Sequence, residues 1–176
     1  KTLGYEVESD LVTNANTAKV NVPTSIKTIK DYVFFNTTSM VNFELSEHVD
    51  NGTSDLVIGK AILGGTTSLV NIKIPFVGSH NYEACNATNN TYDGEETVFG
   101  YFFGYNPTNE GQENVTDKYA NKNLLVQTTQ KLNSETSITT YIPATLRIVE
   151  ITTAKALHFG AFYNVQNVTE YILPDT

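Results

Sequence analysis

Apolar and polar residues alternate along much of this chain, and this period of two limits the possible folds more than any other feature. In residues 98–105, for example, Phe99, Tyr101, Phe103 and Tyr105 share one parity. Roughly ten short runs of this kind, separated by Gly, Pro and Asn, are the pattern of β-strands and turns. No window of a dozen residues has helical spacing, so the sequence predicts an all-β protein.

The 176 residues are enough for one domain with its own core. We recognise no linker and no internal repeat, and we expect an Ig-like or pilin-like β-sandwich over residues 18–176. Residues 1–12 are set apart as an amino-terminal strand, and residues 13–17 as a flexible joint.

Charge and cysteine content narrow the function classes. The net charge is -8 and the basic residues are scattered, which argues against nucleic acid and against an anionic membrane surface. The single cysteine, Cys85, cannot form an intrachain disulfide, although a link between molecules stays open. No apolar run approaches the length of a membrane span, and we interpret the chain as a mature or trimmed one.

Catalytic and metal motifs are not recognised. The three histidines lie far apart in the sequence, and none sits in a nucleophile or zinc pattern. The turn at residues 50–55 offers oxygen ligands for calcium, but its spacing is not that of an EF-hand loop. We therefore expect no enzyme activity, no catalytic residue, no cofactor and no bound metal.

Six Asn-X-Ser/Thr triplets predict N-linked glycans on a secreted protein. Several fall in expected surface loops, where a bulky glycan fits. The acceptor residues are Asn36, Asn51, Asn86, Asn89, Asn114 and Asn167.

The amino-terminal strand carries an amphipathic pattern. Leu3, Tyr5, Val7 and Leu11 share one parity, and the other parity is acidic. Such a strand can pair within its own domain, or it can leave its subunit and complete the sheet of a neighbour. The second arrangement is head-to-tail, does not close and builds filaments. We expect the receiving groove beside residues 18–22 and a late strand such as residues 154–165.

Lys60 is an unusual residue in its segment. It interrupts the apolar run at residues 56–63, which otherwise predicts a strand buried on both faces. A bulge or an edge position would explain the charge, and an isopeptide bond to an Asn or Asp is the alternative.

The amino-terminal "LGYEVESDLV" strand, the "TNANT" joint, the Asn/Thr/Tyr-rich sheet and the six acceptor triplets together resemble archaeal surface threads of the Sulfolobales. These filament subunits are similar to type I pilins, although bacterial pilins usually carry a disulfide. The resemblance implies an N-glycosylated subunit of an extracellular pilus-like filament on the archaeal cell surface. It also implies donor-strand complementation between identical subunits, with a role in cell adhesion or biofilm.

Two other functions remain open from the sequence. A viral capsid, spike or tail-fibre jelly-roll domain would have similar length and strand content. A carbohydrate-binding or hydrolytic β-domain is the third hypothesis.

Overall fold

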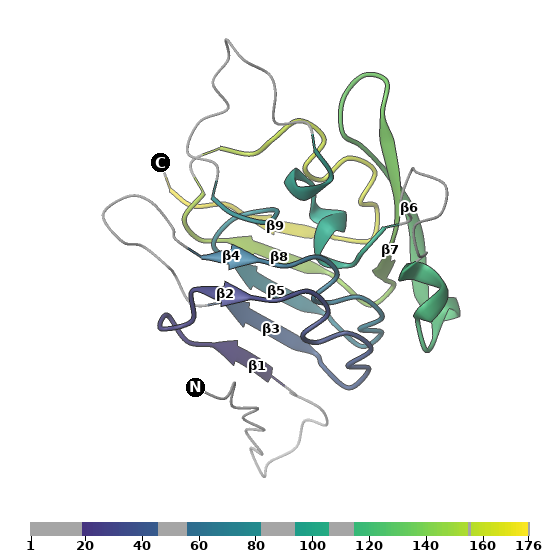
Figure 1. Ribbon diagram of the computed structural model, residues 1–176, viewed down its shortest axis with the longest axis horizontal. Helices are drawn as coiled ribbons and strands as arrows, with labels where there is room; N and C mark the ends of the chain where they lie inside the picture. Colours follow the sequence, from purple (N-terminus) through teal and green to yellow (C-terminus); the bar gives the residue numbers. More distant parts are fainter. Residues whose placement is uncertain (1–18, 46–55, 82–93, 106–114, 155, 176) are drawn as a thin grey trace.

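The fold is described from a computed structural model for residues 19–45, 56–81, 94–105, 115–154 and 156–175. Five strands form the main sheet in the order β1-β3-β5-β8-β9, and every pairing in it is parallel (Figure 1). The strands are β1 (Lys19–Val22), β3 (Asn42–Leu45), β5 (Asn71–Ile74), β8 (Ile148–Ile151) and β9 (Glu170–Ile172). In the described residues the fold is rich in β-structure, as predicted, and has no long helix.

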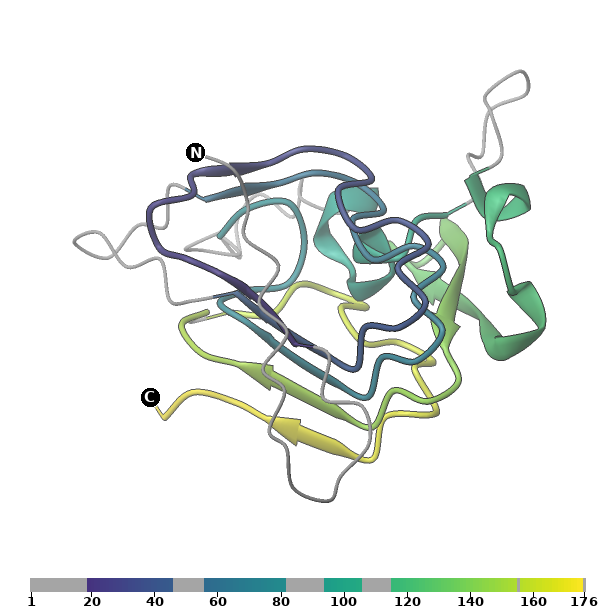
Figure 2. The same cartoon turned by 90° about the horizontal axis from the view of Figure 1, so that it is seen from below.

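The chain winds into stacked coils, each of which adds one strand to the main sheet. After β1 and β3 it crosses to the opposite side, where β2 (Thr28–Ile29) and β4 (Val57–Ile58) pair in parallel. It then returns to the main sheet, so successive coils follow nearly the same path (Figure 2). Because each strand follows a full turn of the chain, all strands of the sheet point the same way. The arrangement is a β-solenoid, in which each coil packs on its neighbours.

The first two full coils are an internal repeat. Thr28 pairs with Val57, and Asn42 with Asn71, and both pairs are 29 residues apart. Residues 37–42 read TTSMVN and residues 66–71 read TTSLVN. The corners repeat as well, because positive φ angles occur at the equivalent positions Asn36 and Gly65. The sequence therefore contains a repeat that we did not recognise from alternation alone.

The core lies between the main sheet and the return segments of the coils. One side-chain position per strand forms a continuous inward row across the sheet, and its first four members are almost completely buried. Burying a side chain of this size contributes about 1.5–3 kcal/mol. In sheet order these members are Val20, Phe43, Ile72 and Val149.

The third coil carries a long insertion before it returns to β8. It contains the 3₁₀ helices η1 (Glu95–Thr97), η2 (Phe99–Phe102), η3 (Val115–Lys118) and η4 (Lys122–Leu124), followed by the antiparallel hairpin β6 (Leu125–Lys131) and β7 (Ser137–Pro143). Buried Gln130 holds the hairpin against the coils. Its Oε1 accepts a hydrogen bond from the Gly100 N–H at 2.5 Å, and its Nε2 donates one to the Ala161 carbonyl at 3.0 Å.

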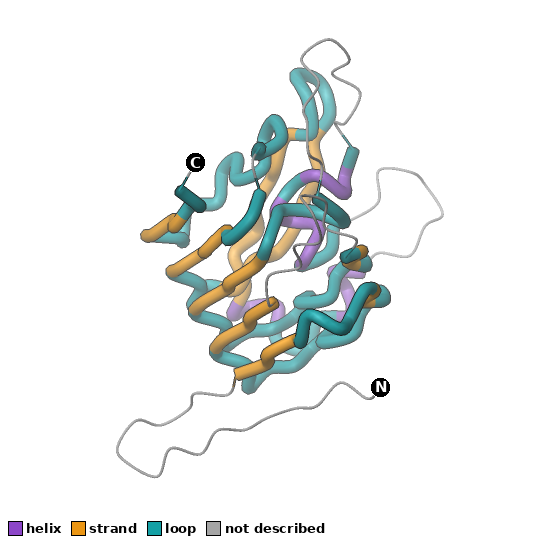
Figure 3. The backbone as a smooth tube through the Cα atoms, turned by 90° about the vertical axis from the view of Figure 1, so that its left-hand side faces the viewer, coloured by secondary structure: helices purple, strands orange, loops and turns teal. Residues whose placement is uncertain are grey.

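The parallel pairing corrects the predicted sandwich. An Ig-like sandwich consists of antiparallel sheets with Greek-key connections, whereas the described strands stack as coils, as Figure 3 shows from the side. Two predicted strands also differ. Residues 98–105 form η2 and a turn rather than a strand, and the described part of residues 154–165 contains no strand. Closely spaced aromatic residues were misleading here, because Phe99, Phe102 and Phe103 all reach the core from one 3₁₀ turn.

Candidate interaction surfaces

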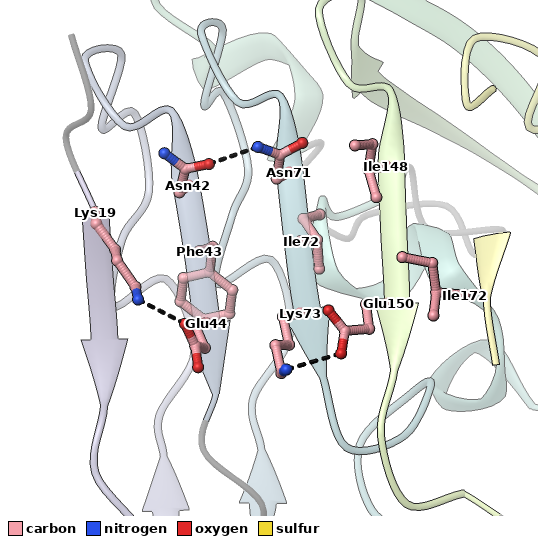
Figure 4. A pocket seen from close by; sticks show the side chains of 10 residues that line it. All are labelled: Lys19, Asn42, Phe43, Glu44, Asn71, Ile72, Lys73, Ile148, Glu150 and Ile172. Carbon is pink, nitrogen blue, oxygen red and sulfur yellow. Dashed lines mark hydrogen bonds and ion pairs between the residues drawn. The ribbon is translucent and has the colours of Figure 1, made fainter. Parts of the chain in front are cut away.

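The outward face of the main sheet carries a shallow groove of about 360 Å³ (Figure 4). It crosses all five strands, and most of the side chains around it come from positions that alternate with the core, whereas Phe43 and Ile72 belong to the inward row. The lining residues are Lys19, Asn42, Phe43, Glu44, Asn71, Ile72, Lys73, Ile148, Glu150 and Ile172.

Polar side chains in this groove pair with one another across neighbouring strands. The Lys19 ammonium lies 2.7 Å from the Glu44 carboxylate, and Asn71 donates to the Asn42 amide oxygen at 2.6 Å. A second ion pair of 2.7 Å joins Lys73 and Glu150. Such partly exposed pairs add little stability, typically up to about 1 kcal/mol each. They do show that Lys–Glu pairs between adjacent strands are a recurring feature of this face.

The two edges of the main sheet differ in how well the core is covered. At β1, the inward-facing Val20 is only 3% exposed. At β9, Tyr171 occupies the same row and is 39% exposed, and Leu173, the next residue of that parity, is 52% exposed. Tyr171 follows Val149 in the row, which is completely buried. The last coil therefore presents apolar core positions to solvent, and we call this surface of β9 and Leu173 the open end.

Two predicted glycosylation sites have their amide groups engaged in the fold. Asn36 Nδ2 donates to the Lys118 carbonyl at 3.0 Å, and Asn36 Oδ1 accepts from the Ala120 N–H at 3.1 Å. Asn167 Nδ2 donates to the Pro143 carbonyl at 2.6 Å. A glycan is attached at Nδ2, so the folded chain disfavours modification of both residues. The other four acceptors lie outside the described residues: Asn51, Asn86, Asn89 and Asn114.

The donor-strand residues Leu3, Tyr5, Val7 and Leu11 also lie outside the described residues, as does Cys85.

Lys60 is described, and it does not lie in a strand. It follows β4 at a corner of the coil, where its ammonium lies 5.2 Å from the centre of the Tyr105 ring. The Asp31 carboxylate accepts a hydrogen bond from the backbone N–H of Lys60 at 2.9 Å. The charge is thus placed at a partly exposed corner, and an isopeptide bond at Lys60 remains an untested prediction.

A small polar cluster lies near the corner that Lys60 occupies. The Tyr105 hydroxyl donates to the Glu95 carboxylate, and burial together with this hydrogen bond raises the pKa of Tyr105. Ser79 Oγ lies 2.7 Å from His80 Nδ1, and burial lowers the pKa of His80 although the charge of Glu96 acts in the opposite direction. Ser79 and His80 are consecutive residues, so their hydrogen bond is a local contact rather than an arrangement brought together by the fold.

Within the described ranges, no three His, Cys, Asp or Glu side chains are grouped so that they could hold a metal ion. In that part of the chain, no helix has the length and apolar character needed to cross a membrane. Comparisons with known proteins find no matching family model, no matching curated protein and no matching solved structure. The function is therefore inferred from the surfaces themselves.

Sequence reasoning missed the open end because it placed the receiving groove beside residues 18–22 and 154–165. The open end is identified by the strand register of the folded chain. It places Tyr171 in line with the buried Val149, and Leu173 is the next residue of the same parity. Alternation alone assigns Tyr171 and Leu173 to a strand, and it does not show that these core-facing side chains are exposed.

Proposed function

We propose that this chain is a structural, non-enzymatic subunit of an extracellular filament and that identical subunits join head-to-tail by strand addition. N-linked glycans on its loops, and a role in adhesion or biofilm, belong to the same proposal. The observation that carries it is the open end, where a parallel sheet stops at a strand whose core-facing residues Tyr171 and Leu173 are exposed.

An edge strand with exposed apolar residues is a template for pairing with another chain. Solenoid proteins usually cover the outer face of a terminal coil with polar residues, and the exposed Tyr171, Ile172 and Leu173 do not provide such a cap. The two edges of the sheet, β1 and β9, are different surfaces of one molecule. A contact between unlike surfaces is heterologous, and it extends into an open filament when the rotation between subunits does not close.

Two segments of an incoming subunit are suited to this addition. The first is residues 3–11, in which Leu3, Tyr5, Val7 and Leu11 would cover the open end as a donor strand. The second is β1, the opposite edge of the main sheet. Both keep the assembly head-to-tail, and they differ in which residues the junction requires.

Electron microscopy of the purified chain over a range of concentrations tests the proposal. We expect single-file filaments, and a chain that stays monomeric at every concentration would contradict it. Deletion of residues 1–12 then separates the two segments. Donor-strand addition predicts monomers that bind the free 1–12 peptide, whereas addition through β1 predicts that the shortened chain still assembles. Closed shells or trimers would instead favour a viral coat or fibre protein.

A further inference from the structure

We infer that the open end is completed by β1 of a second copy, which adds to β9 in parallel and continues the main sheet across the junction. The inference rests on the proposed function and names the strand and the register that join two subunits. It depends on described residues alone, at the two edges of one sheet.

The register inside the sheet determines which residues would meet. Residues in line across the strands are Lys19, Asn42, Asn71, Ile148 and Glu170. If a second copy continues this alignment, its Lys19 lies beside Glu170 of the first copy. Opposite charges directly across neighbouring strands are favourable, and like charges are unfavourable. The junction would thus repeat the directly opposite contact of Lys73 with Glu150, whereas Lys19 reaches Glu44 diagonally within its own sheet.

The inward row matches as well. Val20 of the second copy would lie beside Tyr171 of the first, and Val22 beside Leu173. Both residues of the open end would then meet aliphatic side chains, and period-two alternation would hold across the junction. A shift of one residue would place Lys19 or Asn21 against the exposed Tyr171 ring, so the apolar row selects the register.

The opposite arrangement, with two β9 strands paired about a two-fold axis, would also cover the open end. It would give a closed dimer rather than a filament, and it would not use the Lys19–Glu170 complementarity. The parallel junction is favoured because the charges agree at Lys19 and the apolar pattern agrees at Val20 and Val22, three of the four positions of β1.

Disulfide trapping tests the register directly. Two single-cysteine variants, Asn21→Cys and Ile172→Cys, are made in a Cys85→Ser background, mixed, and oxidised under assembly conditions. Asn21 and Ile172 occupy the same outward row, and neighbouring strands are about 4.8 Å apart, within reach of a disulfide. We expect the mixed disulfide to predominate. The matched control replaces Asn21→Cys with Lys19→Cys, which is out of register with Ile172.

The outcomes distinguish failure of the β1–β9 junction from failure of the proposed filament function. A predominant Ile172→Cys homodimer would overturn the parallel junction in favour of the two-fold one. Filaments without the mixed disulfide would overturn the junction and leave the proposed function standing, and absence of any assembly by the unmodified chain would overturn both.

As a second measurement, sedimentation should show that Glu170→Lys weakens association about tenfold. The same charge change at Glu135, in the hairpin turn, should leave association unchanged.

Discussion

Asn36 offers a direct test of whether an acceptor triplet serves the fold or a glycan. Its side chain bridges two backbone groups of the third-coil insertion, donating to the Lys118 carbonyl at 3.0 Å and accepting from the Ala120 N–H at 3.1 Å. Its backbone is left-handed, with a φ of 57°. We predict that Asn36→Ala destabilises the chain even when no glycan is present.

The expected loss follows from these contacts. A net hydrogen bond contributes about 0.5–1.5 kcal/mol, and both bonds here are exposed, so together they are worth about 1–2 kcal/mol. Alanine in the left-handed region costs a further ~1 kcal/mol, because asparagine tolerates that conformation better. The free energy of unfolding should fall by about 2–3 kcal/mol. For a chain of this length the melting temperature should fall by about 4–12 °C.

Urea unfolding of bacterially produced, unglycosylated protein is the assay. Thr38→Ala is the matched control, because it destroys the same acceptor triplet and leaves the amide of Asn36 intact. Asn36→Gly should recover about 1 kcal/mol of the loss, since glycine adopts a positive φ without strain. If Asn36→Ala unfolds within 0.5 kcal/mol of the unmodified chain, or if Thr38→Ala is equally damaging, the structural role that we assign to Asn36 is wrong.

Three further predictions concern the core, the pH response and the glycans. Gln130→Leu should lower the free energy of unfolding by about 2–4 kcal/mol, because it leaves buried backbone groups without partners; urea unfolding measures this, and a loss below ~1 kcal/mol would contradict it. Burial raises the pKa of Tyr119, whose hydroxyl donates to the Phe103 carbonyl at 2.5 Å. The unfolded chain therefore loses this proton at a lower pH than the folded chain, so the stabilisation is present below about pH 10 and falls above it. Thermal melts of Tyr119→Phe should show a smaller fall in melting temperature at alkaline pH, and an unchanged fall would refute the assignment. In protein glycosylated by its native host, peptide mass spectrometry should find Asn167 largely bare, whereas high occupancy there would show that its contact with Pro143 does not protect it.

The β-rich character of the chain could be predicted because side-chain alternation depends only on local backbone geometry. Alternation does not distinguish parallel from antiparallel pairing, since inward and outward positions alternate in both. In this sheet Phe43 and Ile72 are inward and Glu44 and Lys73 outward, which an antiparallel sandwich would also produce. The alternation therefore indicated the correct faces of these strands, whereas the predicted sandwich implied antiparallel pairing where the sheet is parallel.

The repeat that distinguishes the two folds was obscured by unequal coil lengths. Lys19, Asn42, Asn71, Ile148 and Glu170 are in line across the sheet, yet only one of the intervals between them is 29 residues. The longest interval, between Asn71 and Ile148, contains the whole insertion and its hairpin. A period is recognisable in sequence only where neighbouring coils have the same length, which here means residues 28–45 and 57–74.

The same unequal coils explain why the interaction surfaces could not be placed from sequence. In a sandwich, an amphipathic strand at the end of the chain indicates that a strand is missing at the sheet edge closest to it. In a coil stack, the edges are set by the first and last coils, which here lie about 150 residues apart in the chain. Tyr171 and Leu173 become candidates only when the winding shows that they continue the row of Val149 and Ile151. Lys19 and Glu170 fall in one line at opposite edges of the main sheet. The winding that prevents recognition of the open end in the sequence therefore also gives the two edges of the sheet opposite charges on that line.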